Sequence, residues 1–289
     1  MYILFMEKKF HFRKKYSNIM MSKKSDLRSI AVSITGAPRT FERHPYHLKT
    51  QIERISEVDY YFCLSTSDTS QRDSKGGIQD ANFTFIDTVI RTAYRPIVYK
   101  NVSIPFLHNT KCNVRSNMPV IFDKSNQSTL HRQWETLATI RMCFTHITNH
   151  EFNRRMMYSY IWRIRPDILF YHQLPNILHI VLPTFPEGRI GCNHEPCLND
   201  HLAFLPRYAA AQYFTIADDY TYCRGDYNSM LYYIAETLFE KFKSCFTIDK
   251  TIRYTLSRPF GIDCARVPQA EKFECLSFPV HQSLHQYIF

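Results

Sequence analysis

Residues Tyr158–Phe170, with the sequence YSYIWRIRPDILF, decide the fold that we predict for this chain. The first half of the segment is a run of bulky aromatic and β-branched side chains, which is typical of a strand buried on both faces of a sheet. Pro166 cannot donate a hydrogen bond to a neighbouring strand, so regular pairing is expected to end there. The segment therefore predicts a central strand of an α/β sheet that ends in charged residues.

The charged residues of this segment alternate along the chain. Arg163, Arg165 and Asp167 lie two positions apart, so on an extended backbone they would project to the same side. In an open α/β sheet, ligands bind at the carboxyl ends of the strands, which makes these three residues a candidate binding site. The alternative is a structural ion pair that caps the strand, because buried charges are usually paired whatever their role. The sequence leaves both interpretations open.

The elements around this strand alternate between strand and helix patterns. Strands are predicted at 29–36 (SIAVSITG), 58–68, 95–104, 201–206 and 251–262. Helices are predicted within 37–55, 128–157, 207–220 and 234–245. The order predicts one α/β domain over residues 28–289, with a mixed, mostly parallel sheet that is flanked by helices.

Charge and glycine content narrow the possible functions. The net charge is +10, but eight of the Lys and Arg side chains lie within residues 1–28. We expect residues 1–27 to be a basic, poorly ordered leader. A nucleic-acid-binding role therefore loses its support in the folded part. The chain has only seven glycines and no G-x-G-x-x-G or G-K-[ST] motif, so a glycine-rich phosphate loop is excluded. The apolar Met1–Met6 run is too short for a signal peptide or a transmembrane segment.

Cysteine spacing argues against a structural zinc site. Cys192, His194, Cys197 and His201 are close in sequence, but structural zinc sites usually combine C-x2-4-C pairs with a longer loop. Buried cysteines and surface histidines are the simpler interpretation. A Cys192–Cys197 disulfide is the alternative in an oxidising compartment.

The loops after the first two strands carry groups that suit a nucleotide. If the sheet is parallel, both loops open at the edge where Asp167 lies. Hydroxyl groups and an arginine there match a ribose and a diphosphate, although turns use the same residue types for structural reasons. The candidate residues are Ser33, Thr35, Gly36 and Arg39, which close the first strand, and Ser65, Thr66 and Asp68, which close the second.

Two further carboxylates are candidates for acid–base chemistry. Asp200 directly precedes the apolar 201–206 strand, and Glu236 lies in the predicted 234–245 helix. A turn or helix cap is the ordinary role of an aspartate at such a position, and a glutamate near a helix start is favoured by the helix dipole alone. Neither assignment follows from spacing by itself.

In their order, these motifs resemble a group of GT-A-type glycosyltransferase-like proteins found in algae, plants, bacteria and large viruses. The resemblance covers about Ser29 to Cys245, and R-x-R-P-D is its most specific part. The motifs that carry it are SITGAPRTF, YFCLSTSD, Gln133 near the start of a long helix, WRIRPDILF and DHLAFLPRYAAA.

The resemblance implies a GT-A-like, Rossmann-like fold and a specific set of roles. It implies transfer of a sugar from a nucleotide-diphospho-sugar donor to a glycan, lipid or protein acceptor. Asp167 takes the place of the family's metal- or diphosphate-binding carboxylate, while Arg163 and Arg165 orient it or neutralise phosphate. Asp200 meets the sugar or acceptor, and Asp200 or Glu236 is the candidate catalytic base. The donor pocket is lined by Ser33, Gly36, Arg39, Thr66, Asp68 and Gln133.

One departure from the family pattern leaves metal dependence open. The chain contains no D-x-D motif. Asp167 then holds Mn or Mg as a single carboxylate, helped by donor phosphates and water, or the enzyme works without a metal. A non-catalytic carbohydrate- or nucleotide-binding protein on the same scaffold is the alternative function. The family suggests the Golgi or endoplasmic reticulum lumen, whereas the absence of a visible signal or anchor leaves the cytoplasm open.

Overall fold

The computed structural model describes residues 30–38, 40–65, 70–72, 78–80, 82–102, 124–186, 201–221, 246–258 and 261–262. Only the backbone is described for 70–72, 78–80, 124–134, 219–221, 255, 257–258 and 261–262.

A seven-stranded mixed sheet forms the centre of the fold. Its strands are β1 (Ile30–Gly36), β2 (Asp59–Ser65), β5 (Val98–Val102), β6 (Tyr160–Ile164), β8 (Thr184–Pro186), β9 (Leu202–Pro206) and β10 (Thr247–Asp249). They are arranged in the order β10-β8-β9-β6-β1-β2-β5. β1, β2, β5 and β6 are parallel, and β9 runs antiparallel to β6. The predicted α/β class, with a mixed, mostly parallel sheet flanked by helices, is confirmed.

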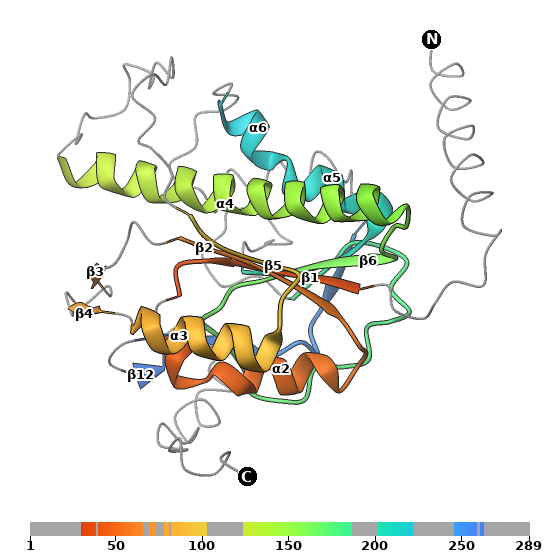
Figure 1. The fold of residues 1–289 in the computed structure, drawn as a ribbon, viewed down its shortest axis with the longest axis horizontal. Helices are drawn as coiled ribbons and strands as arrows, with labels where there is room; N and C mark the ends of the chain where they lie inside the picture. The colour runs from red at the N-terminus through yellow and green to blue at the C-terminus, as the bar shows by residue number, and fades with distance from the viewer. Residues whose placement is uncertain are drawn as a thin grey trace.

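Helices cover both faces of this sheet (Figure 1). α4 (Lys124–Arg154), α5 (Arg207–Phe214) and α6 (Ile216–Thr221) lie on one face. η1 (Phe41–Arg43), α2 (Pro45–Glu53), α3 (Phe83–Val89) and η2 (Ile90–Tyr94) lie on the other. Two small sheets complete the described part: β7 (Ile168–Phe170), β11 (Tyr254–Arg258) and β12 (Gly261–Ile262) form one, and β3 (Ser70–Arg72) pairs with β4 (Ile78–Asp80) in the other.

Alternating side chains of β1 separate two cores. Ala31 packs with the core under α4, whereas Val32 and Ile34 pack with the core over α2 and α3. A parallel strand covered on both faces must be apolar on both, which explains the unbroken apolar runs in the sequence. On α4, an apolar stripe at helical spacing faces the sheet: Leu137, Ile140, Cys143, Phe144 and Ile147.

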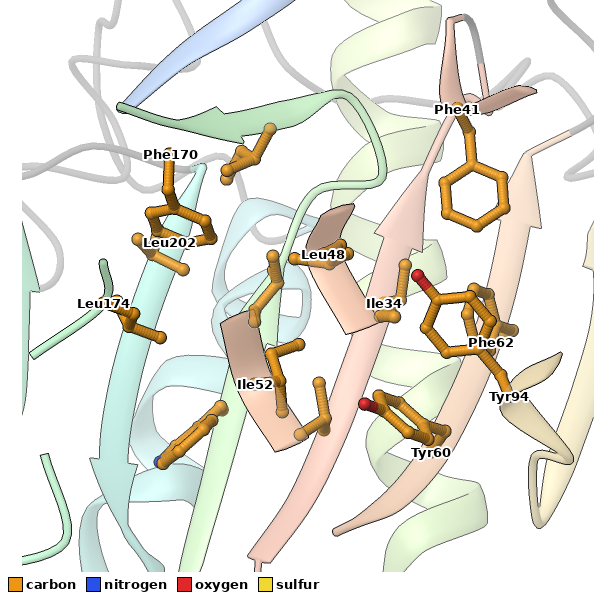
Figure 2. Close-up of a cluster of buried hydrophobic side chains, with 14 of the residues drawn as sticks. Ile34, Phe41, Leu48, Ile52, Tyr60, Phe62, Tyr94, Phe170, Leu174 and Leu202 are labelled. Carbon is orange, nitrogen blue, oxygen red and sulfur yellow. The ribbon is translucent and has the colours of Figure 1, made fainter. Parts of the chain in front are cut away.

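Aromatic and aliphatic side chains pack together in the second core, as Figure 2 shows. Tyr94 packs edge-on against Phe62 and Tyr60, with ring centroids 5.0 and 4.9 Å apart. Phe41 lies edge-on to Phe62 at 6.0 Å. Edge-to-face contacts of this kind add about 0.5–1.5 kcal/mol each beyond the buried area, so they fix how η1 and η2 sit on the sheet.

α2 also holds the chain that follows the central strand. His47 Nε2 accepts a hydrogen bond from the Phe170 backbone N–H at 3.0 Å, and Gln51 Oε1 accepts one from the Leu174 N–H at 2.9 Å. The Arg54 guanidinium donates to the Leu174 carbonyl at 2.6 Å. Because residues three and four apart share one helix face, a single side of α2 satisfies the backbone at 170–174.

The sequence-based element predictions are largely confirmed, but several elements differ. The predicted helix at 207–220 is two helices, α5 and α6, and the late strand at 251–262 is split between β11 and β12. α3 was not predicted, although Asn82 caps its N-terminus by accepting from the Phe85 N–H at 3.0 Å. The predicted helix at 234–245 lies outside the described residues. In the part of the chain that the structure describes, none of the helices is both long and apolar enough for a membrane crossing.

Two histidines at the start of α2 should make stability depend on pH. Burial, with smaller contributions from His47 and Arg43, lowers the pKa of His44 from 6.5 to about 4, and burial also lowers the pKa of His47. The folded state therefore binds fewer protons than the unfolded chain, so the stabilisation is complete above pH 6.5 and is lost as the pH falls toward 4. Urea unfolding at pH 7 and pH 5 should show a loss of about 1–2 kcal/mol.

The loss of unfolding free energy between pH 7 and pH 5 should be smaller in His44→Gln, because this variant lacks the histidine with the more strongly lowered pKa. His179→Asn, a substitution of an exposed histidine, serves as the control and should follow the wild type. An unchanged pH dependence in His44→Gln would show that His44 is not the source.

Candidate functional site

The strand order places a topological switch point between β1 and β6. From β1 the chain proceeds to β2 and then β5 on one side, and it returns to β6 on the other side of β1. At a switch point, the loops after two adjacent parallel strands run in opposite directions, so a crevice forms outside the carboxyl ends of these strands. Ligands of open α/β sheets usually bind in this crevice. The carboxyl ends of β1 and β6 are therefore the candidate functional site.

Polar side chains cluster beneath α4 at this switch point. Ser33 is in register with Arg163 on β6, and both are fully buried. Ala203 on β9 is in register with Arg163, and Tyr61 on β2 is in register with Ser33. Ala203 and Tyr61 belong to the core under α4, so this row of side chains across the sheet faces that helix. One row nearer the carboxyl end, Thr35 Oγ1 accepts a hydrogen bond from Arg163 Nε at 3.2 Å. Two predicted donor-site residues, Ser33 and Arg163, are thus brought side by side.

Two buried hydroxyl groups here have no partner within the described part of the chain. Ser33 Oγ and Ser65 Oγ lie on β1 and β2 and make no hydrogen bond with the described residues. Buried polar groups are nearly always paired, so each unpaired one calls for an explanation. Ser33 and Thr35 supply hydroxyl oxygens beside a buried guanidinium, and Ser65 lies at the carboxyl end of the next strand.

α4 brings a carboxylate over the same region. Glu135 and Thr139 are buried, and Thr139 Oγ1 donates to the Glu135 carbonyl at 2.6 Å. Cys143 Sγ lies 3.6 Å from the Tyr61 carbonyl in the middle of β2. Glu135 precedes Cys143 by eight residues, which is about 12 Å of helix or three to four strand residues, so it lies at the level of Ser65.

Sequence reasoning missed Glu135 and Thr139. A detectable signal was present, because 135, 139, 143 and 147 form one row at a spacing of four, and Cys143 and Ile147 belong to the buried stripe.

Gly36 ends β1 in a conformation that few other residues adopt. Its φ is +126°, which disfavours every residue with a Cβ. A Cβ at this position would lie 3.7 Å from the Pro166 Cδ, so the loops after β1 and β6 approach each other closely here. The predicted importance of Gly36 therefore has a backbone explanation: it turns the chain at the switch point.

Arg165 and Asp167 form a bidentate ion pair after β6. Arg165 Nε and Nη2 donate to Asp167 Oδ1 and Oδ2, each at 2.9 Å. The Asp167 side chain is fully buried, while that of Arg165 is 15% exposed. The Arg165 N–H also donates to the His201 carbonyl at 3.0 Å, which ties the turn to β9. The capping ion pair, one of the two interpretations that the sequence left open, is therefore present, and Arg163 points to Thr35 instead.

The described residues do not form a metal site. No three His, Cys, Asp or Glu side chains gather within the ranges that the structure describes. Both Asp167 oxygens already accept hydrogen bonds from Arg165, so a cation would have to displace that guanidinium. The metal role of Asp167 stays a prediction. Of the zinc candidates, only His201 is described, and its Nδ1 lies 3.1 Å from the Tyr254 hydroxyl.

A cysteine beside the site is unsuited to nucleophilic catalysis. Cys63 lies next to Thr35 on β2 and is a buried free thiol. A hydrogen bond with the Cys143 thiol, together with burial, raises the pKa of Cys63 well above its usual range. Because only the thiolate attacks efficiently, this thiol is structural.

Several predicted site residues lie outside the described part of the structure. These are Arg39, Thr66, Asp68, Asp200 and Glu236, and Gln133 is described only as backbone within α4. Their assignments remain predictions.

Comparisons with known proteins give structural matches only. Neither the protein-family models nor the curated proteins match this chain. A crystal structure of a glycosyltransferase involved in the glycosylation of the major capsid of PBCV-1 has a TM-score of 0.36 and 9% identity, over 82% of this chain and 85% of that chain. The apo-form glycosyltransferase GlyE of Streptococcus pneumoniae TIGR4 has a TM-score of 0.40 and 8% identity, over 78% of this chain and 46% of that chain. These values are low, so the fold class rests on the chain's own strand order.

Breaking the buried ion pair should destabilise the protein. Asp167→Asn leaves Arg165 without its counter-charge in a largely buried position, and we expect the free energy of unfolding to fall by about 3 kcal/mol. Urea denaturation of Asp167→Asn, Arg165→Gln and the double variant should show a coupling between the two positions, because each single change removes the same pair.

Asp87→Asn is the matched control, since Arg91 and Asp87 form an equally direct but exposed pair on a helix. This variant should unfold like the wild type. Additive effects at Arg165 and Asp167 would contradict a paired role.

Proposed function

We propose that this chain is a glycosyltransferase that takes a sugar from a nucleotide-diphospho-sugar donor and passes it to a glycan, lipid or protein acceptor. The domain would be GT-A-like, with the donor at the carboxyl ends of β1 and β6. The proposal rests on the motif order in the sequence and on the chemistry collected at the switch point.

One observation carries the proposal: a buried arginine lies beside two hydroxyl-bearing side chains near the carboxyl ends of β1 and β6, where open α/β sheets usually bind ligands. Arg163 donates to Thr35, and Ser33 lies in register with Arg163. A guanidinium keeps its charge at any physiological pH, and in a site shielded from water its field on a diphosphate is far stronger than on the surface. Arg163 would thus favour the charge that develops on the leaving diphosphate as the glycosidic bond breaks.

The remaining residues would have supporting roles. The Arg165–Asp167 pair would hold the turn after β6 in place and contribute its polar atoms to the crevice wall. In the family's pattern, Asp200 or Glu236 would act as base toward the acceptor hydroxyl. The donor's nucleotide would contact the loop positions already named, Gly36, Arg39, Thr66, Asp68 and Gln133.

Metal use is the part of the proposal with least support from the described residues. Mn or Mg would need Asp167 to release Arg165, and the described ranges contain no group of three or more His, Cys, Asp or Glu side chains that could hold a metal ion. We therefore derive no step through a metal. Donor phosphates compensated by arginine side chains suit a metal-independent reaction equally well.

A second candidate function is a non-catalytic protein that binds a nucleotide or carbohydrate in the same crevice. The engagement of both Asp167 oxygens by Arg165 favours it, because that carboxylate is then occupied with holding the fold.

Nucleoside diphosphates should stabilise the folded protein. A ligand that binds only the native state at 100 times its dissociation constant adds about 2.7 kcal/mol, which corresponds to a rise in Tm of about 5 °C for a chain of this size. A thermal-shift series with UDP, GDP, CDP and ADP should identify at least one such ligand.

Arg163→Met, which keeps the volume but removes the charge, should abolish that rise. Arg141→Met on the exposed side of α4 is the control and should retain it. A full thermal shift in Arg163→Met would remove Arg163 from the donor site.

Turnover separates the two candidate functions. The stabilising nucleotide indicates which sugar nucleotides to test, and release of nucleoside diphosphate should be followed with Mn, with Mg and with EDTA. A transferase should release nucleotide faster when an acceptor glycan is added, whereas a binding protein should give a thermal shift without turnover. Activity that is equal with EDTA and with Mn would establish the metal-independent form.

A further inference from the structure

Exposed apolar side chains gather at the amino-terminal edge of the sheet, opposite the candidate site. Among the side chains that the structure describes, eight large hydrophobic ones are exposed, and only Tyr46 lies at the carboxyl end of the strands, on α2. The other seven lie at the amino edge: Ile97, Phe152, Met156, Met157, Val181, Leu182 and Tyr208.

The topology explains why these seven share one edge. Ile97 directly precedes β5, and Phe152, Met156 and Met157 precede β6, which is parallel to it. β8 and β6 both run antiparallel to β9, so they run in the same direction. Val181 and Leu182 precede β8 and therefore lie at the same edge. Tyr208 follows the end of β9, whose Pro206 is level with Tyr160 at the start of β6. We call these seven residues the amino-edge patch.

One hydrogen bond joins two members of the patch, and a second joins the chain beside them. The Tyr208 hydroxyl donates to the Val181 carbonyl at 2.7 Å, and the Arg207 N–H donates to the Ser159 carbonyl at 2.9 Å. The ends of β8, β9 and β6 are thus held side by side. Within the patch, Phe152 is 83% exposed, Val181 77% and Tyr208 61%. Single exposed apolar residues are ordinary, but a set of this kind on one edge marks an interaction surface.

Cations accompany the patch. Arg154 and Arg155 are exposed between Phe152 and Met156, and Arg95 is exposed two residues before Ile97. The nearby carboxylates are already bound: Glu151 accepts from Arg207 and from the Tyr158 N–H, and Asp59 accepts from the Tyr158 hydroxyl. Glu151 is paired with Arg207 and Glu53 with Lys49, whereas Glu57 and Asp59 keep negative charges that oppose the cations. Arg95, Arg154 and Arg155 outnumber these two carboxylates, so the balance among the groups named here is slightly positive.

The start of β1 adds to this charge. β1 begins with Ile30 at the amino edge, because Ile30 is level with Tyr160. The sequence that joins the fold there, residues 1–28, carries eight Lys and Arg against Glu7 and Asp26.

We propose that the amino-edge patch docks on the surface of an anionic lipid bilayer. Aromatic and methionine side chains beside arginines fit such a surface, since apolar groups enter the headgroup boundary while cations attract anionic lipids. Stable attachment needs more than one contribution, and this edge supplies both apolar side chains and cations. A symmetric contact with a second copy through this patch would bring the arginines of both copies into one interface, which like-charge repulsion disfavours.

Docking through the amino-edge patch would set the distance between the membrane and the candidate site at the carboxyl ends of the strands. β1 is seven residues long, so its carboxyl end is about 20 Å from the amino edge. If the chain is a transferase as proposed above, the crevice would face away from the membrane, and the acceptor would have to extend into the aqueous phase.

Vesicle flotation of the full chain tests the proposal. Vesicles of phosphatidylcholine alone are compared with vesicles that contain 30 mol% phosphatidylserine, at low and at high salt. The wild type should float with the anionic vesicles and be released by salt. The triple variant Phe152→Ser/Met156→Ser/Met157→Ser should bind them about tenfold more weakly, because it loses the apolar contribution. Tyr46→Ser, an equally drastic change at the opposite edge, should bind like the wild type.

A second variant separates the folded edge from the leader. Arg154→Gln/Arg155→Asn removes two cations, and asparagine suits the left-handed conformation of Arg155, whose φ is 54°. This variant should bind at least severalfold more weakly and lose part of the salt dependence. Wild-type binding by both variants, with folding verified by thermal unfolding, would overturn the proposal and assign any binding to residues 1–28. Failure of the wild type to float, or a monomer–dimer change in the triple variant, would overturn it as well. None of these outcomes depends on glycosyl transfer.

Discussion

The pairing of β1 with β2 on one side and with β6 on the other is the interaction on which the rest of the structure depends. A strand in this position is covered on both faces, so every side chain it carries must fit one of two cores. Ala31 serves the core under α4, while Val32 and Ile34 serve the aromatic core over α2. Burial of these apolar surfaces supplies the main stabilisation and fixes which helix lies on which face.

The same pairing forces polar groups into the interior near the carboxyl ends of the strands. Ser33, Thr35 and Arg163 face α4 at positions where an ordinary core would have apolar side chains. Buried polar groups of this kind lower stability relative to a well-packed apolar core. They lie at the switch point, where the ligand sites of open α/β sheets are usually found.

Opposite ends of the strands thus have opposite chemistry. At the carboxyl end, charges are buried and tied to the backbone, as Arg165 is tied to Asp167 and to the His201 carbonyl. At the amino end, charged and apolar side chains such as Arg155 and Phe152 are exposed together. The division follows from parallel strands, which bring all their starts to one edge and all their ends to the other. Binding of a small ligand and attachment to a surface can therefore occupy separate parts of one domain.

The sequence alone determined the class of the fold and most of its elements. Unbroken apolar runs such as 60–64 and the stripe on the long helix are local signals, because burial on both faces or on one stripe constrains every residue of the element. The sequence also placed Arg163 and Asp167 at the end of the central strand, whereas Ser33, predicted at a strand end, lies in the middle of β1. Short elements such as β8 and β10 were not predicted, since three residues carry too little periodicity. Only the tertiary structure decided that Asp167 pairs with Arg165 while Arg163 turns to Thr35, and that Glu135 is buried. These choices depend on where β6 ends and how α4 lies across β1 and β2, and such long-range packing is not encoded in the spacing of neighbouring residues.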